Sequence, residues 1–158
     1  MRKDRLSIYV IWIALAEAVG LLAGILSRNG IELYSDTVIK PLLAPPPILF
    51  PIVWTVLYAL MAVGAARIYM SKDNIARKKG MNLFIAQLII NFFWPLIFFN
   101  TQAFGFAFSW LMLLWTLVLW MTLVFRKVDC ISALLQIPYL IWLSFAAYLN
   151  LSIWLINR

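Results

Sequence analysis

Three stretches of this 158-residue chain place aromatic and amide side chains at helical spacing. The first carries Trp54 and Tyr58, the second Gln87, Asn91, Trp94 and Phe98, and the third Trp142, Ala146 and Asn150. Residues three or four apart share one face of an α-helix, so each stretch predicts one aromatic and polar stripe. Flat rings combined with a few amides suit the stacking and hydrogen bonding of a large apolar ligand.

The same stripes have a purely structural interpretation, because Asn and Gln inside lipid-spanning helices also bond neighbouring helices. Spacing does not distinguish a packing seam from a shared pocket, and both interpretations stay open. Acid–base and metal chemistry find little support, since the chain has no His and one Cys, Cys130. That composition excludes His-based zinc and haem ligation and the Ser-His-Asp and Cys-His mechanisms. We expect no metal site and no cofactor.

Composition indicates that the stripes lie in a membrane. Hydrophobic residues make up 65% of the chain and charged residues 12%, against about 45–50% and about 25% in soluble proteins. Segments of about 20 apolar residues span a bilayer core, and five occur, at residues 6–26, 47–67, 81–100, 104–125 and 131–156. Their continuous apolar runs differ from the alternating pattern of a membrane β-barrel. We predict an all-α membrane protein, a five-transmembrane-helix bundle forming a single domain over residues 1–158.

The connections between the segments are also predictable in outline. A polar, proline-containing loop at residues 27–46 joins the first two segments, and the polar residues 100–102 separate the third from the fourth. Pro95 cannot donate to the carbonyl four residues back, so we expect the side chain and carbonyl of Asn91 to be free for another partner. Pro138 predicts a bend in the last segment.

Glu17 is an acid near the middle of the first segment, with no Lys or Arg inside a span to pair with it. An ionisable residue at that depth indicates a functional site by default, but a polar neighbour or a wet cavity would explain it equally well. Glu17 also supports an alternative function, a proton-coupled exporter of small aromatic cations. One turn further, Gly20 and Gly24 predict either a dimer seam or close packing within the bundle.

The distribution of Lys and Arg predicts the orientation. With five spans, the basic residues on the side of the N-terminus are Arg2, Lys3, Arg5, Arg67, Lys72, Arg77, Lys78, Lys79, Arg126 and Lys127, against Arg28, Lys40 and Arg158 on the other side. Basic residues favour the cytoplasmic side, so we expect a cytoplasmic N-terminus and an external loop at residues 27–46. Membrane topology explains the excess of basic over acidic residues. We expect no nucleic-acid partner, because the sequence shows no soluble basic face interleaved with aromatic residues.

Three blocks of sequence carry a family resemblance. Residues 40–58 contain Lys40-Pro41, Pro45-Pro46 and the run FPIVWTVLY; residues 87–99 contain Gln, Asn and the run WPLIFF; residues 138–150 contain PYLIW, FA and LN. In this order, and with five spans, the blocks resemble the translocator protein family, also called tryptophan-rich sensory proteins or TspO/MBR.

The resemblance implies a membrane sensor, often a homodimer, that binds protoporphyrin IX or another large apolar aromatic ligand in a cavity covered by the loop after the first helix. It implies that Trp54 and Trp142 lie in this pocket and that Tyr34, Pro45 and Pro46 of the loop contact the ligand. In some bacterial members such tryptophans are linked to light-dependent porphyrin breakdown, which is the one enzymatic activity we expect here. The expected location is the bacterial inner membrane, with the lipid bilayer as surroundings.

Cysteine labelling tests the predicted topology. In a Cys130→Ser background, a membrane-impermeant thiol reagent added outside intact cells should label Ser35→Cys and leave Ser71→Cys unlabelled, because the charge bias puts residue 35 outside. Lysed cells provide the control, since both positions should then react. Labelling of residue 71 alone in intact cells would reverse the orientation.

Overall fold

The computed structural model describes residues 2–72 and 74–158, with the side chains of 5–72 and 75–158. The side chains of Arg2 and Lys3, counted in the charge bias, lie outside this part. The elements are α1 Arg2–Leu26, α2 Arg28–Thr37, α3 Leu49–Tyr69, α4 Asn74–Pro95, the π-helix η1 Leu96–Asn100, α5 Phe104–Val128, α6 Cys130–Leu134 and α7 Ile137–Ile156. The described residues contain no strand, and the predicted all-α fold is confirmed.

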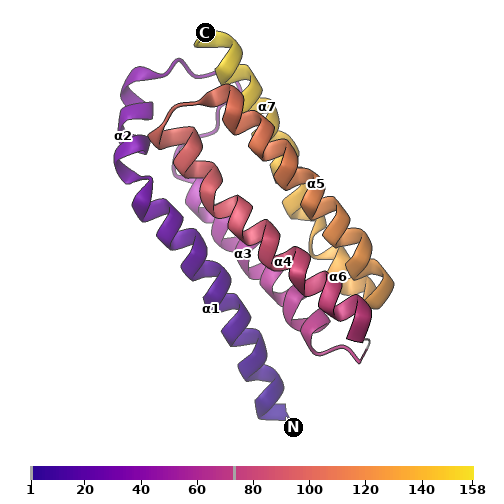
Figure 1. Ribbon diagram of the computed structural model, residues 1–158. Helices are drawn as coiled ribbons and strands as arrows, with labels where there is room; N and C mark the ends of the chain where they lie inside the picture. Colours follow the sequence, from indigo (N-terminus) through magenta and orange to yellow (C-terminus); the bar gives the residue numbers. More distant parts are fainter. Residues whose placement is uncertain (1, 73) are drawn as a thin grey trace.

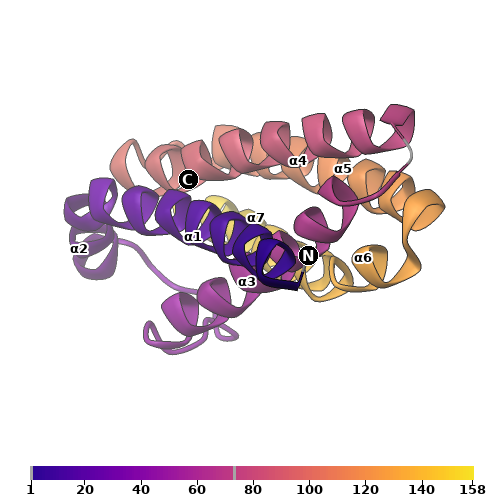
Figure 2. The ribbon, with the colours of Figure 1, turned by 90° about the horizontal axis from the view of Figure 1, so that it is seen from below.

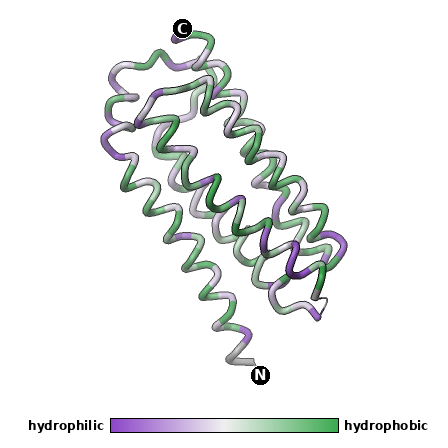
Figure 3. Tube along the Cα trace, in the orientation of Figure 1, coloured by the Kyte–Doolittle hydropathy of each residue, from purple (hydrophilic) through white to green (hydrophobic). Residues whose placement is uncertain are grey.

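Five helical segments are long and apolar enough to cross a membrane: Arg5–Leu26, Leu49–Tyr69, Ile75–Asn100, Phe104–Val128 and Cys130–Ile156. Green, which marks hydrophobic residues, dominates along the helices, and the purple of hydrophilic residues gathers toward the two ends of the bundle (Figure 3). The chain termini lie at opposite ends, and the α3–α4 and α5–α6 connections lie at the same end as the N-terminus (Figure 1). This arrangement is that of an integral membrane protein with an odd number of spans.

The helices pack unevenly around the core. From below, α4 and α5 lie on one side of the bundle and α3 and α6 on the other (Figure 2). The pairs α4–α5, α1–α3 and α5–α7 pack most closely, and Trp12, in the N-terminal half of α1, contacts the rings of Tyr69 and Phe84. The largest fully buried side chains include Met61, Phe84, Phe125 and Tyr139. The core therefore lies among α3, α4, α5 and α7, and α1 lies at the flank of the bundle, with a smaller buried share than the other spans.

The connection after α1 differs from the predicted loop. Residues 28–37 form the helix α2, and the irregular part begins at Val38. No proline occurs before Pro41, and Arg28 Nε donates to Glu32 Oε1 at 3.4 Å, four residues on. A helical i,i+4 pair of this kind stabilises a short surface helix. The polar composition of the segment had led us to predict a loop instead.

The break in the last segment falls earlier than the bend predicted at Pro138. The helix stops after Leu134, and α7 begins at Ile137, so that Pro138 lies in its first turn. Proline is favoured there because the missing N–H would have no intrahelical acceptor. Pro95, in contrast, ends α4, and the π-helix η1 continues the segment.

A polar clamp joins α3 to the corner between α5 and α6. Arg67 donates from Nε to Asp129 Oδ2 at 2.6 Å and from Nη2 to Oδ1 at 3.1 Å. Asp129 also caps α6 by accepting from the backbone N–H of Ser132 at 3.1 Å and from its hydroxyl at 2.6 Å. The Arg67 guanidinium, followed by these Ser132 donors, holds the pKa of the Asp129 carboxyl well below its usual range. Nearby, Gly64 lets Gln136 approach so closely that any Cβ would collide with it.

Removing the clamp should lower stability in two steps. Asp129→Asn keeps a cap but loses the bidentate ion pair, which we expect to cost roughly 1–3 kcal/mol; Asp129→Ala also loses the cap, about 1 kcal/mol more. Thermal unfolding in non-ionic detergent measures both, with the exposed Lys127→Gln as the neutral control.

The pH dependence has a fixed sign. Because the folded pKa of Asp129 lies below the ordinary value of 3.8, its contribution is complete above that value and is lost as the pH falls below it. The difference in Tm between wild type and Asp129→Asn should therefore stay constant through neutral pH and shrink in acid. A difference that shrinks on the alkaline side would contradict the ion-pair account.

Candidate functional site

A cavity of about 890 Å³ lies between α1, α2, α3 and the C-terminal end of α4. Its aromatic wall consists of Phe50, Trp54, Tyr58, Trp94 and Phe99. Its polar side chains are Glu17, Ser27, Arg28, Glu32, Thr55 and Asn91. This volume falls within the range of about 300–1,000 Å³ that is usual for small-molecule sites, and an apolar wall with a few polar groups is their usual lining.

Four of the predicted site residues line this cavity together: Trp54, Tyr58, Asn91 and Trp94. The rings of Trp54 and Tyr58 lie 5.6 Å apart at 35°, one helical turn from each other on α3. Trp94 stacks on Phe98 with centroids 5.0 Å apart. Its indole Nε1 is buried and has no hydrogen-bond partner among the described residues. The α3 and α4 stripes thus converge on one cavity.

A buried chain of hydrogen bonds lies behind the cavity wall. Tyr58 donates to Asn91 Oδ1 at 3.4 Å, Asn91 Nδ2 donates to the Tyr139 hydroxyl at 2.7 Å, and that hydroxyl donates to Gln87 Oε1 at 3.1 Å. Gln87 Nε2 in turn approaches Met61 Sδ at 3.6 Å. Gln87 is therefore part of the packing behind the cavity, and the Asn91 side chain, which we expected to be free for another partner, bonds Tyr58 of α3 and Tyr139 of α7.

Tyr139 joins this chain at its centre, and the sequence analysis did not select it. It is 1% exposed, and its ring lies 6.0 Å from that of Trp54. Tyr139 lies three residues before Trp142 and therefore shares a helix face with it. This spacing was the one sequence signal that could have selected Tyr139.

Trp142 does not line the cavity and lies one ring behind it. Its ring contacts that of Phe50, which does line the cavity, with centroids 5.8 Å apart. Its Nε1 is buried without a hydrogen-bond partner among the described residues. Sequence reasoning therefore missed Phe50, which lies four residues before Trp54 on α3 and occupies the place expected for Trp142.

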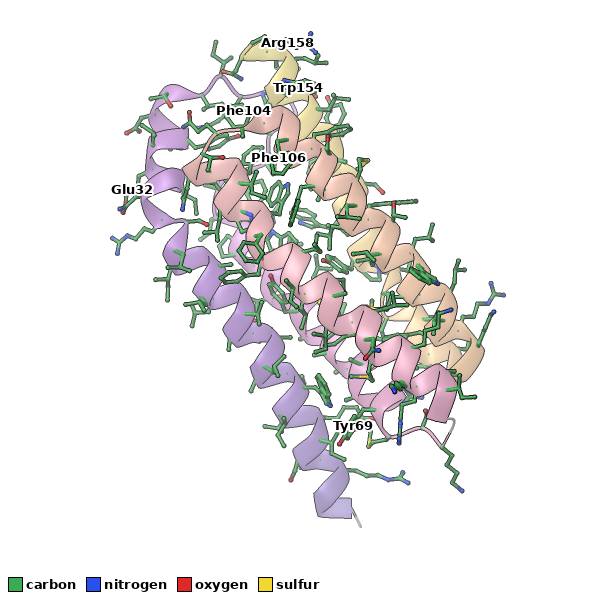
Figure 4. The ribbon with its side chains drawn as sticks, in the orientation of Figure 1. Glu32, Tyr69, Phe104, Phe106, Trp154 and Arg158 are labelled. Atoms are coloured by element: carbon green, nitrogen blue, oxygen red, sulfur yellow. The ribbon has the colours of Figure 1, made fainter. Side chains whose placement is uncertain are left out.

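The remaining predicted residues lie elsewhere. Phe98 is buried in a second aromatic cluster, where Tyr34 of α2 packs on it with centroids 5.5 Å apart. Asn150 donates to the carbonyl of Phe104 at 2.8 Å, and Ala146 is buried in the main core. Pro45 and Pro46 lie in the connection before α3, and neither lines the cavity. Figure 4 shows Phe104 near Trp154 at the end of the bundle where the chain finishes.

The segment that contains α2 and the connection to α3 is held to the bundle by hydrogen bonds at two places. Asn157 accepts from the backbone N–H of Ile39 at 2.9 Å and donates to its carbonyl at 3.0 Å. Asn100 donates to the carbonyl of Leu26 at 2.9 Å. Asn100 thus holds the end of α1 and Asn157 the connection after α2, so together they position α2, whose Ile31 and Glu32 line the cavity.

The first helix contributes Glu17, Gly20 and Gly24 to the cavity wall. The Tyr58 ring lies where a Cβ on Gly20 would be, so Gly20 is used for close packing within the bundle. A Cβ on Gly24 would meet no atom within 4 Å. Glu17 has neither a hydrogen bond nor an ion pair within residues 5–72 and 75–158. The homodimer stays a prediction.

The side chains of the cavity wall define which ligand groups it could contact. Over the described residues, no group of three or more His, Cys, Asp or Glu side chains is arranged to hold a metal ion. The rings of the wall offer stacking surfaces, and Glu17 offers an acceptor. A flat apolar ligand with polar edges matches this lining.

Comparison with known proteins agrees with the blocks read from the sequence. The chain is 34% identical to the tryptophan-rich protein TspO of Chlorobaculum tepidum, covering 99% of both chains. It is 31% identical to the protein CrtK of Rhodobacter capsulatus over 96% of this chain and 94% of that one. It is 31% identical to the human translocator protein over 75% of this chain and 72% of that one. The family profile matches residues 12–155, and the chain therefore belongs to the TspO/MBR family of membrane proteins.

Proposed function

We propose that this protein is a membrane sensor that binds a tetrapyrrole such as protoporphyrin IX between α1, α3 and α4. The observation that carries the proposal is the cavity of about 890 Å³ with five aromatic residues in its wall. A macrocycle presents two flat apolar faces, and aromatic rings bind such faces by stacking and area burial. Names of relatives include a tryptophan-rich sensory protein and translocator proteins.

The charges support an N-terminus in the cytoplasm and a location in the bacterial inner membrane. Arg5, the connection carrying Lys72 and the end of α5 carrying Arg126 and Lys127 gather at one end of the bundle (Figure 1). The segment that contains α2 lies at the other end, near the C-terminus. In this orientation the cavity lies toward the external half of the membrane.

Filling the cavity should block porphyrin binding. Gly24→Phe places a phenyl ring where the wall is open, so it takes volume that the ligand needs, and we expect at least a tenfold loss of affinity, about 1.4 kcal/mol. Gly24→Ala, which adds one methyl group into open space, is the matched control and should bind like wild type. Titration of the purified proteins with protoporphyrin IX in darkness measures the affinities. If Gly24→Phe binds protoporphyrin IX with wild-type affinity, the porphyrin site lies outside this cavity.

Light should separate stacking from electron transfer. Trp54 lines the cavity, so its indole is in reach of an excited macrocycle, whereas Trp142 lies behind Phe50. Phenylalanine keeps the apolar surface but is much harder to oxidise. We therefore expect Trp54→Phe to retain most of the binding and to slow porphyrin loss under light, Trp142→Phe to slow it less, and the double variant to slow it most.

Absorbance of bound protoporphyrin IX during illumination measures this loss, and dark samples of every variant should stay constant. Trp120→Phe is the matched control, because Trp120 lies on a separate surface groove beside Lys79. If the double variant bleaches porphyrin at the wild-type rate, the two tryptophans have only a structural role, and the proposal is limited to porphyrin binding.

A further inference from the structure

Glu17 gives the cavity an uncompensated carboxylate. It lies in the middle of the span Arg5–Leu26 and lines the cavity. No base within residues 5–72 and 75–158 pairs with it, whereas the other acid of the wall, Glu32, accepts from Arg28 at 3.4 Å. The pair of Arg28 and Glu32 contributes no net charge. The charge of the wall is therefore that of Glu17.

The surroundings of Glu17 are aromatic rather than basic. Gly20, three residues on and on the same face of α1, lets the ring of Tyr58 lie directly against the helix. Trp54 follows with its ring 5.6 Å from that of Tyr58. The Tyr58 hydroxyl donates to Asn91 Oδ1 at 3.4 Å. This bond holds the Tyr58 ring in place beside α1.

These two features favour the same ligand charge. A carboxylate in a low-dielectric site is stabilised by a positively charged hydrogen-bond donor. The faces of Trp and Tyr rings carry negative potential and attract cations as well. A carboxylate on a ligand would instead be repelled by Glu17 and by the ring faces.

We propose that Glu17 makes the cavity selective for ligands that carry a protonated amine, or a comparable N–H-rich cationic group, beside a flat aromatic body. Glu17 accepts the N–H, and the rings of Trp54 and Tyr58 stack on the body. The inference rests on the proposed function, in that it takes this cavity as the ligand site. For a tetrapyrrole, whose carboxylates lie at one edge of the macrocycle, it predicts that this edge points away from Glu17 and toward Arg28, about three helical turns further along the wall.

A matched pair of ligands isolates the charge. 1-Pyrenemethylamine and 1-pyrenemethanol have the same ring system and differ in one group, a cation against a neutral hydroxyl. Their affinities are measured at neutral pH by tryptophan quenching, with the protein in nanodiscs of zwitterionic lipid. Lipid partitioning of each probe is common to all variants, so the amine-to-alcohol affinity ratio is compared between proteins.

We expect the ratio to fall about tenfold in Glu17→Gln, which keeps the shape of the side chain, while the alcohol binds as in wild type. Glu17→Ala should lower the ratio equally. Asp36→Asn removes one exposed negative charge of α2 outside the cavity wall and should leave the ratio unchanged. Circular dichroism and gel filtration confirm that each variant is folded.

The outcomes separate this inference from the function on which it rests. Saturable binding of protoporphyrin IX with equal amine-to-alcohol ratios in wild type and both Glu17 variants overturns the role of Glu17 and keeps the porphyrin site. So does a wild-type protein that binds protoporphyrin IX and shows no saturable binding of the amine. Absence of saturable binding for all three ligands rejects the proposed function itself, and the selectivity with it.

Discussion

Inside hydrocarbon a polar side chain has no water to bond, and the hydrogen-bonded chain of Tyr58, Asn91, Tyr139 and Gln87 meets this constraint by joining three helices. Tyr58 belongs to α3, Asn91 and Gln87 to α4, and Tyr139 to α7. Each member is less than 7% exposed, so a change in the rotation of any one helix would strand buried polar atoms. The chain therefore fixes how the α3 and α4 stripes face each other, and with them one wall of the cavity.

The opposite wall has no comparable constraint. α1 packs mainly on α3 and meets it through small residues, above all Gly20, where a ring of the partner helix takes the place of a side chain. Its far end is held through the backbone, by the bond from Asn100 to the Leu26 carbonyl. Beyond that point α2 is fastened through Tyr34 on Phe98. The cavity thus has a rigid side made by α3 and α4 and a more adaptable side made by α1 and α2.

The sequence predicts the spans and two of the three stripes, because apolar runs and helical spacing are local properties. Which stripe reaches the cavity depends on the rotation of each helix, and spacing contains no such information. Trp142 shows the difference: its spacing puts it on one helix face with Ala146, yet the cavity is lined by Phe50, whose ring contacts that of Trp142, and not by Trp142 itself. Asn150 likewise bonds a backbone carbonyl of α5. The hydrogen bonds of Tyr139 could not be predicted for the same reason, since its partners Asn91 and Gln87 belong to another helix.

The two sides of the cavity differ in chemistry: among the described residues Glu17 on α1 has no hydrogen bond or ion pair, and the rings of Trp54 and Trp94 line the side of α3 and α4. A ligand contacts both sides at once if it carries a donor at one edge and a flat apolar body beside it. Such a ligand would connect the adaptable side to the rigid side, adding contacts between α1 and the helices α3 and α4. It would then favour one position of α1 by its differential affinity for that position. That differential affinity is the physical requirement for a binding site to act as a sensor, and it needs no catalytic group.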